Sequence, residues 1–351
     1  MSCSPCSPKR LPAEWEPQCA VMLTWPHAQT DWADQLDETE ETFFAIAEAV
    51  CRYQNLLISC QSFEQLEGIA DRLSEQGIPP ERVRLFCVPS NDSWCRDHGP
   101  ITVYENDQPV LLDFKFNAWG GKFAHEKDDM ITRILDELDA FDGAPIRHID
   151  TILEGGSIES DGQGTILTTS ACVLTPTRNA GATRTSVENL FRDTLGADRV
   201  LWLDHGYLAG DDTDSHIDTL ARLCNETTIC YVACEDPSDE HFAELNAMKA
   251  QLEGMTQRNG NPYTLVPLPM ASACFSEDGH RLPATYANFL IINDAVLLPV
   301  YGLPEDDEAI RVMHSLFPDR AIEAINCRSL IEQHGSLHCV TMQLPAGVFE
   351  E

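Results

Sequence analysis

The feature that most constrains the fold is an alternation of short apolar runs with amphipathic helical stretches along the chain. Leu56–Ile58 reads as a buried strand, and residues 66–73 carry apolar side chains at the spacing of one helix face. Ser62 and Gln65 predict a capping box where that helix begins, and Gly77 fits a left-handed cap where it ends. This alternation predicts an α/β fold.

Helices of this type recur along the chain. They are expected to begin near Ser62, Asp128, Thr183, Ser238 and Pro304. These starts lie about 55 to 66 residues apart, which favours five repeated strand-and-helix modules. A further helix near Phe43 to Tyr53 has no counterpart in that count. No linker or compositional step divides the chain, so we expect a loose tail over residues 1–10 and a single domain over residues 11–351.

Charge narrows the class of partner. The chain carries 23 Lys plus Arg against 57 Asp plus Glu, a formal net charge of -34. Such a field repels nucleic acid and anionic membranes and attracts small cations. Acidic surfaces also serve solubility, so charge alone identifies no substrate.

The compartment is expected to be reducing and cytoplasmic. The chain has 14 cysteines, but its first ten residues contain no apolar run that could serve as a signal peptide. No segment approaches the ~20 uninterrupted apolar residues of a membrane-spanning helix. The role of Cys3 and Cys6 stays open.

Three segments carry side chains suited to chemistry. Ser90–Pro100 crowds polar groups around Trp94 and Asp97, although taken alone it would read as a surface loop with a half-buried Trp. Glu154 stands directly before two glycines, a pairing that lets backbone pass close to a ligand while the carboxylate faces it.

His216 and Asp218 lie two residues apart, so on an extended strand both would face the same side. Cys339 ends a Gly-led loop and enters an expected strand. Most of the cysteines are expected to be small buried hydrophobic residues, so this position alone does not identify a nucleophile.

A metal site is the alternative reading of the same side chains. The candidate ligands are Asp214, His216, Asp218 and Cys339. Zinc sites more often combine two or more His or Cys at short spacing, and neither Cys3 with Cys6 nor Cys230 with Cys234 has a convincing second pair. We therefore expect no metal.

Taken together, these segments resemble the agmatine deiminases, a branch of the guanidine-modifying superfamily that also includes peptidylarginine and arginine deiminases. The matching motifs occur in order along nearly the whole chain: Leu11–Pro17, Thr24–Pro26, Asp92–Asp97, Phe116–Lys122, Glu154–Gly156, His216–Asp218 and His338–Cys339. The resemblance implies a five-bladed α/β propeller, the pentein fold, with pseudo-fivefold symmetry and a central active-site channel.

The resemblance also implies a role for each matching residue. Cys339 matches the nucleophile, His216 the general acid and base, Asp97 and Asp218 the guanidinium-binding carboxylates, and Glu154 the acid beside the His. A guanidinium is planar and protonated, so its carbon becomes open to attack only when charge-assisted bonds hold its nitrogens. The bound cation also favours the thiolate form of the cysteine.

The implied reaction converts agmatine and water to N-carbamoylputrescine and ammonia through a cysteine thiouronium, without a cofactor, on a polyamine route to putrescine. Trp94 and Trp119 are expected to cover the methylenes of agmatine, and surplus carboxylates to hold its distal ammonium.

Three alternatives remain at this point. The run His334–Cys339 departs from the Gly-rich stretch ending in Asn that family members often carry, which leaves a C-terminal arginine of a peptide open as substrate. Against arginine, Arg96 lies inside the aspartate motif, and Arg178 and Arg184 are expected to flank a solvent-facing turn and helix start. An inactive polyamine-binding protein and amidino transfer to an amine also remain. A homo-oligomer, and whether Cys95 reacts or packs, are open as well.

Overall fold

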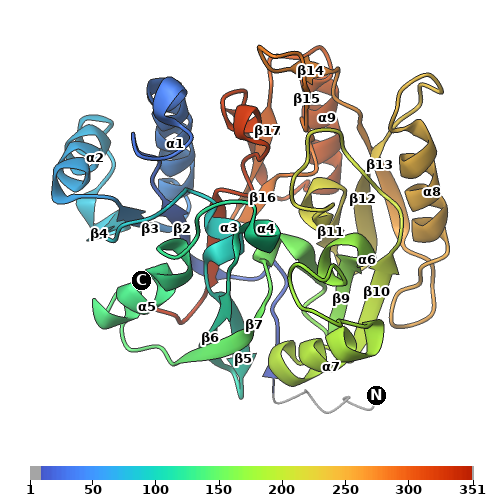
Figure 1. The fold of residues 1–351 in the computed structure, drawn as a ribbon, viewed down its shortest axis with the longest axis horizontal. Helices are drawn as coiled ribbons and strands as arrows, with labels where there is room; N and C mark the ends of the chain where they lie inside the picture. Colours follow the sequence, from blue (N-terminus) through green and yellow to red (C-terminus); the bar gives the residue numbers. More distant parts are fainter. Residues whose placement is uncertain (1–8, 350–351) are drawn as a thin grey trace.

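The fold is mixed α/β, as the alternation predicts. The computed structural model describes residues 9–349. In that part of the chain, strands form five sheets of three or four strands and one two-stranded sheet. Figure 1 shows the larger helices around the rim of the molecule, with the short helices α3 (Cys95–His98) and α4 (Ala118–Gly121) near its middle.

The first sheet joins the two ends of the described chain. Its strands, in spatial order, are β19 (Thr341–Pro345), β2 (Gln18–Thr24), β3 (Asn55–Cys60) and β4 (Val83–Cys87). Helices α1 (Leu36–Cys51) and α2 (Phe63–Glu75) make the parallel connections from β2 to β3 and from β3 to β4. β19 pairs antiparallel with β2, so a residue just before β19 is held by the sheet that begins the fold.

The second sheet has the order β1 (Lys9–Arg10), β5 (Ile101–Glu105), β6 (Gln108–Lys115) and β7 (Ile146–Ile152). The turn η3 (Asp128–Met130) and helix α5 (Ile131–Glu137) connect β6 to β7. The expected loose tail lies outside the described residues except for Lys9 and Arg10, which pair with β5. Those two positions therefore belong to a sheet.

The remaining three sheets repeat one pattern, an antiparallel pair followed by a parallel pair across a helix. Their strands are β8 (Ile158–Ser160), β9 (Thr165–Thr169) and β10 (Arg199–Leu203); β11 (Ala221–Asn225), β12 (Thr228–Ala233) and β13 (Thr264–Pro269); and β16 (Leu290–Ile292), β17 (Ala295–Val300) and β18 (Ala321–Asn326). Their helices are α7 (Arg184–Leu195), α8 (Phe242–Glu253) and α9 (Asp306–Leu316).

Shorter elements complete the described chain. They are η1 (Ala33–Gln35), η2 (Pro80–Arg82), η4 (Gly155–Ser157), α6 (Ser170–Val173), η5 (Ile217–Thr219), β14 (Cys274–Phe275), β15 (Arg281–Leu282) and η6 (Leu330–Gln333).

The predicted helices are present, and the helix near Phe43 is the extra helix of the first sheet. Ser62 caps α2 by accepting from the Gln65 backbone N–H at 3.2 Å, and Gly77 has a φ of +78°. The predicted capping box is incomplete, because the Gln65 side chain accepts from Gln61 instead of from the Ser62 backbone. The five predicted modules correspond to the five larger sheets, whereas their arrangement as a propeller stays a prediction.

Buried apolar side chains of α1, α8 and α9 pack with those of β2, β3, β12 and β17 in one continuous core. Within residues 9–349, no helix combines the length and the apolar character needed to cross a membrane.

Candidate active site

Each of the five larger sheets contributes a polar side chain from the segment just ahead of one strand. These residues are Asp97 in α3 before β5, Glu154 next to η4 before β8, His216 and Asp218 at η5 before β11, Asn288 before β16, and Cys339 before β19. η4 contacts both α3 and η5. The structure therefore brings the five predicted catalytic residues together from four modules, with His216 and Asp218 in the same one.

His216 lies between two carboxylates and is fully buried. Its Nδ1 is 3.6 Å from Asp97 Oδ1, and its Nε2 is 3.8 Å from Glu154 Oε2. Burial alone would lower the pKa of His216, but the charge of Asp97 and the contact with Cys172 raise it well above the ordinary value. The extended strand expected for His216 and Asp218 is wrong, because Asp218 lies in the 3₁₀ turn η5 that begins right after His216.

Asp97 is held by neutral donors. Its Oδ1 accepts from the Gly156 backbone N–H at 3.0 Å, and its Oδ2 accepts from Trp119 Nε1 at 2.9 Å. Burial raises the pKa of Asp97, which the nearby His216 only partly opposes. Ala118 and Trp119 adopt left-handed φ values of 47° and 55°, a strained turn that carries the Trp119 indole toward this carboxylate.

Asp218 is held from one side only. Its Oδ2 lies 2.8 Å from His338 Nδ1, whereas its Oδ1 is buried without a hydrogen-bond partner among the described residues. Burial would raise the pKa of Asp218, but the hydrogen bond to His338 holds it below the ordinary value. An ionised, half-satisfied carboxylate is therefore available to a cation.

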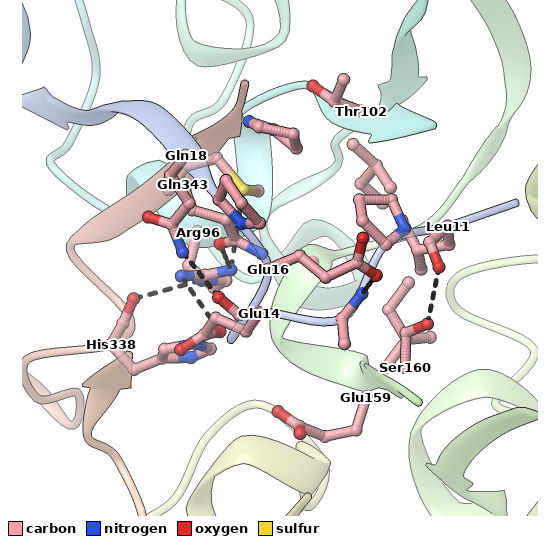
Figure 2. Close-up of a pocket in the computed structure, with 18 residues that line it drawn as sticks. Leu11, Glu14, Glu16, Gln18, Arg96, Thr102, Glu159, Ser160, His338 and Gln343 are labelled. Atoms are coloured by element: carbon pink, nitrogen blue, oxygen red, sulfur yellow. Dashed lines mark hydrogen bonds and ion pairs between the residues drawn. The ribbon is translucent and has the colours of Figure 1, made fainter. Parts of the chain in front are cut away.

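The other side of His338 faces a charged network behind the site (Figure 2). His338 Nε2 lies 2.7 Å from Glu14 Oε2, and Arg222 donates to the same oxygen at 3.1 Å. Arg96 lies nearby and donates through Nε to the His338 carbonyl oxygen at 3.3 Å. Glu14, Arg96 and His338 border a cavity of ≈ 50 Å³. The sequence motifs containing Glu14, Arg96 and His338 thus support the site from behind.

Glu154 has a buried cationic partner. Arg178 Nε donates to Glu154 Oε1 at 2.9 Å, and the same guanidinium pairs with Asp214. Burial would raise the pKa of Glu154, but the nearby His216 ring and the charge of Arg178 lower it. The turn beside Arg178 is exposed at Pro176 and Thr177, as expected, but the Arg178 side chain itself is buried, whereas Arg184, at the start of α7, is exposed.

Cys339 is 4% exposed, and its Sγ lies 3.4 Å from Asn288 Oδ1. Burial and the charges of Asp218 and Asp97 raise the pKa of its thiol well above the ordinary value. Sequence reasoning missed Asn288. Its position ahead of a strand in the fifth module, where the other modules carry site residues, is the signal that could have found it.

A cavity of ≈ 130 Å³ leads to Cys339. Its lining residues are Asp31, Asp92, Trp94, Asp97, Trp119, Phe123, Asp212, Thr213, Gln333, His334, Gly335 and Cys339. Gly335 is required where the loop crosses Trp94, because a Cβ there would lie 2.1 Å from the ring. Trp94 and Trp119 meet edge to face, with ring centroids 6.2 Å apart. No lysine or arginine lines this cavity in residues 9–349.

The structure also shows where the other cysteines lie and whether the candidate metal ligands cluster. Cys95 is buried and packs with an apolar cluster, and every described cysteine is free. Cys3 and Cys6 lie outside the described residues.

The metal ligands considered from the sequence do not form one cluster in the described chain. A different set does: potential ligand atoms of Glu154, Cys172 and His216 lie within 4.8 Å of one another.

The raised thiol pKa yields a direct prediction. Iodoacetamide alkylates the thiolate, so labelling of Cys339 should become fast only well above the ordinary thiol pKa. Asp97→Asn removes a neighbouring negative charge and should move the inflection to lower pH. Peptide mapping across a pH series measures it, with Asp198→Asn, on the surface beside Arg258, as the charge control. An unchanged inflection in Asp97→Asn would contradict this electrostatic account.

Comparisons with known proteins agree with this geometry. Residues 10–345 match the family model described as Porphyromonas-type peptidyl-arginine deiminase. An agmatine deiminase of Stutzerimonas stutzeri is 30% identical, with 96% of this chain and 95% of that protein covered.

Two solved structures are also similar. A cysteine-to-serine variant of C. jejuni agmatine deiminase with substrate bound is 34% identical, with a TM-score of 0.88 and 96% of both chains covered. A Porphyromonas gingivalis protein, provisionally assigned as an arginine deiminase, is 49% identical, with a TM-score of 0.89, 97% of this chain and 99% of that chain covered. The resemblance deduced from the motifs is confirmed: the chain belongs to the Porphyromonas-type peptidyl-arginine deiminase family.

Proposed function

We propose that this protein hydrolyses agmatine to N-carbamoylputrescine and ammonia, with Cys339 as the nucleophile. The observation that carries the proposal is the cavity over Cys339, which combines carboxylates and indoles and has no lysine or arginine in its lining within the described chain. Agmatine is a dication with an apolar middle. A free or peptide-terminal arginine would bring an α-carboxylate, which needs a cationic partner.

The substrate would lie along this cavity with its guanidinium innermost. Asp97 and the free Oδ1 of Asp218 would accept from the guanidinium nitrogens and fix the plane of the cation. Trp94 and Trp119 would cover the methylenes. Three further carboxylates, those of Asp31, Asp92 and Asp212, line the cavity and can receive the distal ammonium. Burial raises the pKa of Asp92 to about 6, so its carboxylate is mostly ionised at neutral pH.

Substrate binding would itself activate the nucleophile. In the free enzyme, burial and the charges of Asp218 and Asp97 raise the pKa of the Cys339 thiol and hold it protonated. A bound guanidinium neutralises these charges and stabilises the thiolate, whose proton leaves for solvent. The thiolate then attacks the guanidinium carbon and forms a C–S bond. Asn288, whose amide oxygen lies 3.4 Å from the sulfur, helps to orient the Cys339 side chain.

His216 would carry the proton in both halves of the reaction. Its raised pKa keeps the ring protonated, so it can give a proton to the departing nitrogen as the C–N bond breaks and ammonia leaves. A thiouronium remains on Cys339. The neutral ring then takes a proton from water, whose oxygen attacks the same carbon, and the C–S bond breaks to release the ureido product. Glu154, held by Arg178, stabilises the charged form of the ring.

Some relatives favour agmatine as the substrate, and one favours arginine. Proteins named agmatine deiminase match nearly the whole chain, and one of the solved structures contains substrate. The more similar P. gingivalis structure, whose assignment is to arginine, keeps an arginine substrate as the second candidate.

A substrate panel tests the proposal. Ammonia release should occur with agmatine and be at least about 10³-fold lower in Cys339→Ala, because the variant lacks the nucleophile. Free arginine and a peptide with C-terminal arginine should be poor substrates. Turnover of the peptide in place of agmatine would move the protein to the peptidyl-arginine branch. Binding of agmatine without ammonia release, in the presence or absence of an acceptor amine, would favour a binding protein, and product formed only with the amine would indicate amidino transfer.

Adding a methyl group at Gly156 tests how closely the site residues must pack. A Cβ at Gly156 would lie 2.6 Å from His216 Nδ1, 2.9 Å from Asp97 Oδ1 and 3.0 Å from Asp218 Oδ2. Gly156→Ala should therefore lower kcat/KM for agmatine by about 10²-fold or more, because misplacement by about 1 Å is costly in a preorganised site. Gly68→Ala, with nothing within 4 Å of the added atom, is the matched control. Equal kinetics in the two variants would refute this role for the close packing.

A further inference from the structure

A second thiol lies against the catalytic machinery without a part in the proposed reaction. Cys172, in α6, is fully buried, and its Sγ is 4.0 Å from Glu154 Oε2. The same carboxylate oxygen is 3.8 Å from His216 Nε2. Sulfur, nitrogen and oxygen atoms of three different residues thus lie within 4.8 Å of one another.

These three atoms face one another. Arg178 occupies Glu154 Oε1, which leaves Oε2 to face the other two side chains. Both ring nitrogens of His216 are buried and make no hydrogen bond among the described residues, and Nε2 is the one that faces Glu154. A buried ring nitrogen without a partner is uncommon, and here it points toward a carboxylate oxygen and a thiol.

Thiolate, imidazole and carboxylate form a donor set that suits Zn²⁺. With Zn–ligand bonds of about 2.0 to 2.3 Å, ligand atoms around a tetrahedral zinc lie roughly 3.3 to 3.8 Å apart. The observed separation of 3.8 Å lies at the upper end of that range, that of 4.0 Å exceeds it by little, and all three atoms lie within 4.8 Å of one another. The charges also balance, since one thiolate and one carboxylate neutralise the ion, and Arg178 keeps its pairing with Asp214.

We propose that Glu154, Cys172 and His216 form an inhibitory zinc site, with water as the fourth ligand. Binding would replace the proton of the Cys172 thiol by the metal and release that proton to solvent. The metal would occupy Nε2, the nitrogen through which His216 faces Glu154. The ring could then not take the doubly protonated form from which it is proposed to give a proton to the departing nitrogen. The inhibition rests on the proposed function, whereas the binding site does not.

Cobalt(II), which takes the same ligands as zinc, provides a readout that is independent of turnover. The full-length protein with Cys3→Ser and Cys6→Ser, which removes a second pair of thiols, should bind one equivalent of Co²⁺ with a thiolate-to-cobalt absorption band. Cys172→Ala should abolish the band. Cys339→Ala should keep it, as should Cys230→Ala, a control at another fully buried cysteine. No band in the parent, or a band lost in Cys339→Ala and kept in Cys172→Ala, would overturn the proposal.

Inhibition is measured on the same proteins. Zn²⁺ should inhibit ammonia release by the parent, and a chelator should reverse the effect. Cys172→Ala should need about 10- to 100-fold more zinc than the parent for half inhibition, measured against its own rate without metal. This is the scale on which altered metal sites lose affinity. If circular dichroism shows that the alanine variant folds poorly, Cys172→Ser, which is similar in size and has no thiolate, replaces it in this measurement. Unchanged zinc sensitivity in a folded Cys172 variant would refute inhibition at this site.

Discussion

The burial of carboxylates around Cys339 is the constraint on which the rest of this structure depends. Removing a carboxylate from water is unfavourable unless charges or hydrogen bonds replace the lost hydration. Glu154 has Arg178, and Asp218 has His338 on one side. Asp97 has a backbone N–H, an indole N–H and a histidine that lies 3.6 Å away. The set is incomplete until a cation enters, and a guanidinium has the charge and the planar donors to complete it.

The fold meets this constraint by drawing on every module and by supporting the site from behind. A strand order in which the C-terminal β19 pairs with β2 fixes Cys339 against the first sheet. Glu14, from the opening motif of the chain, contacts His338, which in turn holds Asp218. The N-terminal segment therefore supports the proposed guanidinium-binding carboxylate from behind. The turn at Ala118 and Trp119 supports the site in the same indirect way. Its strained backbone positions the Trp119 indole N–H to donate to Asp97.

Much of this arrangement could be predicted from the sequence. The module count follows from helical periodicity and capping residues, and the five candidate catalytic residues follow from motifs that resemble those of the agmatine deiminases. Periodicity does not reveal local backbone. The spacing of His216 and Asp218 suggested a strand, but a 3₁₀ turn places one residue at its start and the other within it. Arg178 looked solvent-facing because its burial depends on Glu154, a partner 24 positions away. Asn288 carries no motif of its own, and only its place ahead of the fifth sheet marks it.

The central claim is that Cys339 forms a covalent bond with the guanidinium carbon, and a rapid chemical quench tests it most directly. Enzyme mixed with agmatine, stopped in acid within one turnover and examined by intact mass, should gain the mass of agmatine less ammonia. Peptide mapping should locate that adduct on Cys339. Ammonia formed within the first turnover with no adduct at any time, or an adduct on Cys95 or Cys172 instead, would contradict the account.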